Sequence, residues 1–194
     1  MRIGYDLDGV GYVFGASVRN HLATKGIDVP PATDEFCTHW DFYEFLGMTR
    51  EEFGMHCDEG ADAGIIFGPG EGLTRPNFFE SMARSKALGH TNVIVTHRFQ
   101  GSPGSAERNT EAWLAPYRHL VDELYYSKDK TIGNCDMFVE DSLPNYDRLV
   151  EHGVDAYLID RPWNGPYNDH RARIADVSEY ADMVEARTNG LIVV

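Results

Sequence analysis

The segment Arg2–Val10 constrains the fold most strongly, because a short apolar run ends there in two carboxylates one residue apart. Residues 2–5 have the pattern of a buried strand, and Asp6 and Asp8 leave its carboxyl end together, followed at once by Gly9. Open α/β sheets bind their ligands in the crevice at the carboxyl ends of the strands. The sequence therefore predicts a pair of chemically active carboxylates at one edge of a sheet.

Three further apolar runs lead to polar side chains that could act on the same ligand. The first ends in a hydroxyl group, a lysine follows the second, and the third ends in two acids. The runs and their polar residues are 92–95 with Thr96, 122–126 with Lys130, and 136–139 with Glu140 and Asp141. If these strands are parallel, their carboxyl ends meet at one edge, so we expect a single site there.

Strand and helix patterns alternate over the second half of the chain. A further strand is expected at 155–159, and residues 191–194 form a weaker candidate. This alternation predicts an α/β fold with a doubly wound, mainly parallel sheet. The helices expected between and after the strands cover about 105–118, 143–152 (with Pro144 near its first turn) and 175–187.

The long interval between the first two strands breaks this alternation. It reads as a small helical cap inserted after the first strand, at residues 13–88. The resulting division is a core of residues 1–12 and 89–194 with the cap between them. Thr49 and Glu52 fit a capping box at the start of one cap helix. The cap helices are expected at 15–26, 40–46, 49–57 and 77–88.

Composition excludes several classes of function. The formal net charge is −14, with 31 acidic residues against 17 Lys and Arg, which argues against a nucleic-acid polymer as partner. The chain has no apolar run of about 18 residues, so no membrane span is expected. It has no signal-peptide pattern, and its three scattered cysteines suggest no disulfide framework. These features predict a cytoplasmic protein.

The segment Asp6–Val10 resembles the first signature of the haloacid dehalogenase (HAD) phosphatase superfamily, Asp-x-Asp-Gly-(Thr/Val), and the other three signatures follow in the family's order. The resemblance implies that Asp6 is the nucleophile and a Mg²⁺ ligand, that Asp141 is the second carboxylate ligand, and that Asp8 contributes its carbonyl oxygen. The Asp8 side chain would be the general acid and base. The resemblance also implies that Lys130 neutralises charge on Asp6 and the phosphoryl group.

Within the superfamily, the chain is similar to the 5′(3′)-deoxyribonucleotidase branch. The similarity lies in Asp129-Lys130-Thr131, in residues 110–114 and in residues 159–164. The fourth signature departs from this branch, because it reads Glu-Asp-Ser at 140–142 where the mammalian members have Asp-Asp-Arg. The residues after Thr96, which begin His97-Arg98, differ as well. Thr96 and the backbone N–H of His97 are expected to hold a phosphate oxygen.

The cap of this branch supplies aromatic rings that stack on a nucleobase. Trp40, Phe42 and Tyr43 are the candidates here, although the same rings could instead form the small core of the cap. We therefore expect a Mg²⁺-dependent phosphatase for (deoxy)nucleoside monophosphates, working through an aspartyl-phosphate. The alternatives are a HAD phosphatase for another small monoester, such as a sugar phosphate, and a non-catalytic nucleotide-binding protein. A homodimer is possible.

Overall fold

In a computed structural model, residues 1–29, 39–165 and 168–191 are described. Six parallel strands form one sheet in the order β3-β2-β1-β4-β5-β6, which confirms the predicted doubly wound α/β class. The strands are β1 (Arg2–Tyr5), β2 (Thr91–Thr96), β3 (Glu123–Tyr126), β4 (Met137–Glu140), β5 (Asp155–Ile159) and β6 (Arg173–Ile174).

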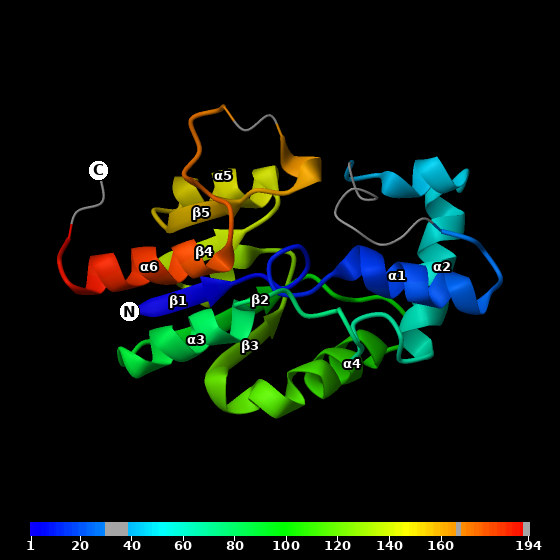
Figure 1. Ribbon diagram of the computed structural model, residues 1–194, viewed down its shortest axis with the longest axis horizontal. Helices are drawn as coiled ribbons and strands as arrows, with labels where there is room; N and C mark the ends of the chain where they lie inside the picture. Colours follow the sequence, from blue (N-terminus) through cyan, green and yellow to red (C-terminus); the bar gives the residue numbers. More distant parts are fainter. Residues whose placement is uncertain (30–38, 166–167, 192–194) are drawn as a thin grey trace.

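Helices cover both faces of this sheet, and a pair of helices lies beyond the carboxyl ends of the strands (Figure 1). The α-helices are α1 (Phe14–Thr24), α2 (Arg50–Asp62), α3 (Phe78–Ala87), α4 (Ser105–Leu114), α5 (Leu143–Glu151) and α6 (Val177–Thr188). The 3₁₀ turns are η1 (Phe42–Leu46), η2 (Ala115–Leu120), η3 (Lys130–Gly133) and η4 (Pro162–Asn164). Among the described residues, none of these helices is both long and apolar enough to cross a membrane.

The side chains of neighbouring strand residues point to opposite faces, and this alternation divides the core into two clusters. Ile94 packs in the cluster that includes α3 and α6, whereas Val93 and Val95 pack in the cluster that includes α5. At Gly4, a β-carbon would lie 2.2 Å from the ring of Phe138 on β4. Glycine is therefore required there for the two central strands to pack as they do.

Most of the predicted helices and strands are present in the structure, although several begin or end at other residues than predicted. The capping box of Thr49 and Glu52 is present at the start of α2, and that helix runs past the predicted end at 57 to Asp62, with Gly60 and Ala61 buried in its last turn. The predicted helix 105–118 changes to 3₁₀ geometry at Ala115, just before Pro116. The two-residue strand β6 was not predicted. Of the weak strand candidate 191–194, Leu191 is not in a strand and the rest lies outside the described residues.

Helix α3 falls within residues 77–88, which the prediction assigns to the cap. It lies against α6 and β2, within the layer that covers the sheet. Helix α2 instead packs against α1, η1 and α4. The division into a core and a cap at 13–88 stays a prediction, and the contacts of α3 favour an earlier return of the chain to the core.

Candidate active site

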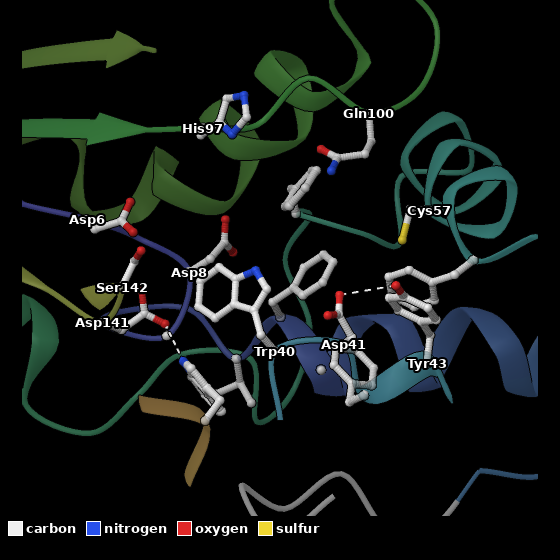
Figure 2. A pocket seen from close by; sticks show the side chains of 18 of the residues that line it. Asp6, Asp8, Trp40, Asp41, Tyr43, Cys57, His97, Gln100, Asp141 and Ser142 are labelled. Carbon is white, nitrogen blue, oxygen red and sulfur yellow. Dashed lines mark hydrogen bonds between the residues drawn. The ribbon is translucent and has the colours of Figure 1, made fainter. Parts of the chain in front are cut away.

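The site lies at the carboxyl ends of β1 and β4, which are neighbours in the middle of the sheet. The strand order reverses here, because β2 and β3 lie on one side of β1 while β4, β5 and β6 lie on the other. At such a point the connections leave in opposite directions and open a crevice above the sheet. A cavity of about 530 Å³ opens above this edge. Figure 2 shows Asp6, Asp8 and Asp141 grouped at one end of it.

Asp6 and Lys130 form a buried ion pair. Lys130 Nζ donates to Asp6 Oδ1 over 2.6 Å and to the Val95 carbonyl oxygen over 2.8 Å. The lysine sits at the start of η3, where Asp129 caps the turn by accepting a hydrogen bond from the Thr131 amide. Its pKa is raised, because the carboxylates of Asp6 and Glu140 outweigh the effect of burial, which lowers it. Lys130 is therefore a fixed cation directly beside Asp6.

Three carboxyl groups, those of Asp6, Glu140 and Asp141, meet at this edge. Each can offer one oxygen, and these oxygens lie within 4.8 Å of one another. Burial is the main cause that raises the pKa of all three groups, to about 7 for Glu140, and mutual repulsion adds to it. Burial and repulsion make it costly to keep all three groups charged. A divalent cation would remove this cost, because it favours the charged form of each carboxylate.

The donor set suits Mg²⁺, which prefers carboxylate oxygens and water. Glu140 Oε1 accepts hydrogen bonds from the amides of Asp141 and Ser142, whereas its buried Oε2 has no hydrogen-bond partner. Asp141 Oδ2 accepts a hydrogen bond from the Trp163 indole over 2.8 Å, which orients that carboxylate. The unpartnered oxygen of Glu140 adds a candidate ligand to those that the sequence suggested.

Gly9 makes the close approach of the first loop to Asp141 possible. Its φ of +80° lies in the left-handed region, and a β-carbon at this position would lie 2.0 Å from Asp141 Oδ2. The Gly9 carbonyl accepts a hydrogen bond from Arg161 Nε over 2.6 Å, which holds the loop from the other side. Glycine is thus needed here for its backbone conformation and for the space beside the carboxylate.

Thr96 ends β2 and is fully buried, so it does not line the cavity itself. Its hydroxyl oxygen has no hydrogen-bond partner, which is costly for a buried polar atom and is unusual in proteins. His97 follows and does line the cavity, with its ring 4.6 Å from that of Phe99. Burial is the main cause that lowers the pKa of His97, and Lys130 lowers it further.

The three aromatic residues predicted to stack on a base all line the cavity, but they differ in their surroundings. Trp40 is 58% exposed and lines the same cavity as Asp8. Phe42 is buried and meets Phe53 edge-on at 5.3 Å, while Tyr43 stacks on Phe53 at 5.1 Å. Phe42 and Tyr43 therefore also take part in the packing of η1 on α2, which is the alternative that the sequence left open for such rings.

Arg98 is the main site residue that the sequence analysis did not assign. It is buried and forms a two-pronged ion pair with Asp8, with Nε 2.9 Å from Oδ2 and Nη2 2.8 Å from Oδ1. The sequence held one signal for this pairing, because Arg98 follows the end of β2 by two residues and therefore lies at the same edge of the sheet as Asp8. Trp163 was also unassigned, although it belongs to the segment 159–164 that carries the family resemblance.

Comparison with known proteins supports the fold. No protein-family model and no curated protein sequence matches the chain significantly. Among solved structures, a HAD phosphatase from Thermococcus onnurineus is similar, with 16% identity, a TM-score of 0.52, and coverage of 94% of this chain and 97% of that one. A dehalogenase is also similar, with 13% identity, a TM-score of 0.60, and coverage of 94% and 96%.

A third similar structure is that of CbbY from Rhodobacter sphaeroides, a mutant in complex with xylulose bisphosphate. It has 14% identity, a TM-score of 0.57, and coverage of 92% of this chain and 95% of that one. At such low identity these matches concern the fold. The chain has the HAD-type α/β fold that the resemblance implied.

Proposed function

We propose that this protein is a Mg²⁺-dependent phosphatase that hydrolyses small phosphate monoesters through an aspartyl-phosphate on Asp6. The observation that carries the proposal is the buried Asp6–Lys130 pair beside Glu140 and Asp141, at the reversal point of a HAD-type sheet. An anionic nucleophile can approach a phosphate dianion only where positive charge is concentrated. Lys130 and a bound cation would supply that charge here.

The residues suit a two-step reaction. In the first step an Asp6 oxygen bonds to phosphorus while the ester oxygen leaves with its electron pair and takes a proton. In the second step water bonds to phosphorus, the bond to Asp6 breaks, and a base takes the proton of the water. Lys130 stabilises the charge near Asp6 in both steps. The contact of Thr96 with a phosphate oxygen stays a prediction, because its unpartnered hydroxyl is buried and does not line the cavity.

Mg²⁺ would be held by Asp6 and Asp141, with Glu140 and the Asp8 carbonyl as further candidate ligands. When bound, it supplies positive charge that neutralises the phosphoryl oxygens. We assign both proton transfers to Asp8, the one to the leaving group and the one from the water, because Asp8 lines the cavity two residues after the nucleophile.

We propose a (deoxy)nucleoside monophosphate as substrate. Several aromatic side chains line the cavity, and Trp40 among them is sufficiently exposed to stack on a base. A sugar phosphate is the second candidate, favoured by the structural similarity to a protein that binds xylulose bisphosphate. Phosphate release from a panel of nucleotides and sugar phosphates, with and without Mg²⁺, would rank the two. No metal-dependent release from any of them would contradict the phosphatase proposal.

The sharpest variant for the nucleotide proposal is Trp40→Ala. Base–aromatic stacking contributes about 1–3 kcal/mol in single-strand binders. We therefore expect kcat/KM for a nucleotide to fall by roughly 5- to 150-fold, at about 1.4 kcal/mol per tenfold. Hydrolysis of p-nitrophenyl phosphate, which carries no base, should change far less.

Phe45→Ala is the matched control for this variant. Phe45 is an exposed aromatic residue of the same segment, 62% accessible, but it does not line the cavity. This variant should leave both substrates unaffected. An equal loss on both substrates for Trp40→Ala would mean that Trp40 holds the cap together, and the nucleotide proposal would lose its main support.

A further inference from the structure

Arg98 and Asp8 form an ion pair in which both oxygens of the carboxylate are engaged. The guanidinium donates from Nε to Oδ2 and from Nη2 to Oδ1, at 2.9 and 2.8 Å. This parallel pairing is the strongest and most directional contact that an arginine makes with a carboxylate. The guanidinium is fully buried, while the Asp8 side chain keeps 28% of its surface open on the cavity side.

The surroundings of Arg98 fix its guanidinium on every side. Its central carbon lies 4.6 Å from the ring centres of Tyr12 and Phe67 and 5.7 Å from that of Trp113. Its third nitrogen, Nη1, donates to the Thr110 hydroxyl over 3.0 Å. A buried cation is costly unless it is paired, so these contacts and the carboxylate of Asp8 depend on one another.

Arg98 does not line the cavity, so it is placed to act on Asp8 rather than on a substrate. Because one planar guanidinium donates to both oxygens, the contact fixes the plane and the direction of the Asp8 carboxyl group. A carboxyl group held in this way presents a single orientation to the cavity.

We propose that Arg98 is a positioning residue that orients the Asp8 side chain toward the water that hydrolyses the Asp6 phosphoenzyme. This inference rests on the proposed phosphatase function. In the step concerned, water bonds to phosphorus, the bond between phosphorus and Asp6 breaks, and Asp8 takes the proton from the water. Loss of Arg98 should slow this second step more than the first, provided that the leaving group needs no proton.

Rapid-mixing kinetics with p-nitrophenyl phosphate and Mg²⁺ separates the two steps. Nitrophenolate leaves without a proton, so its first turnover reports formation of the phosphoenzyme, and later turnovers report its hydrolysis. For Arg98→Met we expect a burst close to one nitrophenolate per enzyme, followed by turnover slowed by about 10²-fold, the low end for a general base. Phosphoenzyme should accumulate in acid-quenched samples. Arg98→Lys keeps the charge but not the two-pronged contact, so its rate of later turnover should lie between those of wild type and Arg98→Met.

Two further variants keep the test decisive. Thr110→Val removes the third contact of Arg98, together with the hydrogen bond from the Thr110 hydroxyl to the Ala106 carbonyl. It serves if Arg98→Met does not fold, and we expect a smaller slowing of the second step. Arg84→Gln is the matched control, because Arg84 pairs with Asp182 and Glu185 on α6, away from the cavity, and should behave as wild type.

The outcomes distinguish this inference from the function on which it rests. A merely structural role of Arg98 would lower the burst and the later turnover together, in proportion to the folded fraction, and that result would overturn the inference. Wild-type protein that releases no nitrophenolate with Mg²⁺ would overturn the phosphatase proposal as well. An active wild type whose Arg98 variants accumulate no phosphoenzyme would overturn the inference alone.

Discussion

Replacing Asp8 by asparagine should destabilise the protein as well as slow its reaction, because Asp8 is the acidic partner of a fully buried guanidinium. In the Asp8→Asn variant, one oxygen can still accept from Arg98, but the amide group faces the second donor and carries no charge. The variant therefore leaves a buried, uncompensated cation between three aromatic rings.

The size of this loss follows from the exposure of the two side chains. Removing one member of a fully buried ion pair costs about 3–5 kcal/mol. The Arg98 side chain is 0% exposed, but that of Asp8 is 28% exposed, so water screens part of the interaction. We therefore expect a loss of about 2–3 kcal/mol of unfolding free energy. For a chain of this length, this corresponds to a fall in Tm of roughly 4–12 °C.

Thermal melting in metal-free buffer measures this loss. Asp182→Asn is the control, since it makes the same chemical change in a pair where Asp182 is 65% exposed, and it should cost no more than about 1 kcal/mol. The double variant Asp8→Asn/Arg98→Met should recover part of the loss, because it removes the unpaired charge. A Tm for Asp8→Asn equal to that of the surface control would refute the reasoning, since the pair would then contribute nothing to stability.

The remaining predictions concern the carboxylates and the first loop. Burial raises the pKa of Glu140 to about 7, and those of Asp6 and Asp141 are also raised. Without metal, the folded state thus holds protons that the unfolded state loses near pH 4, so stability should fall as pH rises from about 4 to 7. Mg²⁺ replaces these protons, so the increase in Tm that it produces should be larger at pH 8 than at pH 5.5; an equal increase would count against the ligand set. Gly9→Ala should lower Tm and weaken Mg²⁺ binding in calorimetry, because its β-carbon would meet Asp141; unchanged Mg²⁺ binding would contradict this.

The sequence predicted which polar residues meet at the carboxyl edge of the sheet, because the relevant signals are local. Each strand is a short apolar run, and Asp6, Lys130 and Asp141 follow such runs closely. The position of a residue just after a parallel strand fixes the edge of the sheet to which it belongs. This rule needs no knowledge of long-range packing.

The features that were missed depend on contacts between distant segments. The pairing of Arg98 with Asp8 joins residues 90 positions apart, and nothing in the residues beside Arg98 names its partner. The packing of α3 on α6, near the end of the chain, also depends on such contacts, and the assignment of α3 to the cap rested only on its place before the second strand. The short strand β6 has only two residues, too few for a periodic pattern.

The central claim is that Asp6 carries the phosphoryl group during turnover. The most direct measurement is mass spectrometry of protein quenched in acid during hydrolysis of p-nitrophenyl phosphate with Mg²⁺. We expect one added phosphoryl group on the peptide that contains Asp6, absent without Mg²⁺ and absent in Asp6→Asn, which should also be inactive. Undiminished turnover by a verified Asp6→Asn protein, or a phosphoryl group on another residue, would contradict the claim.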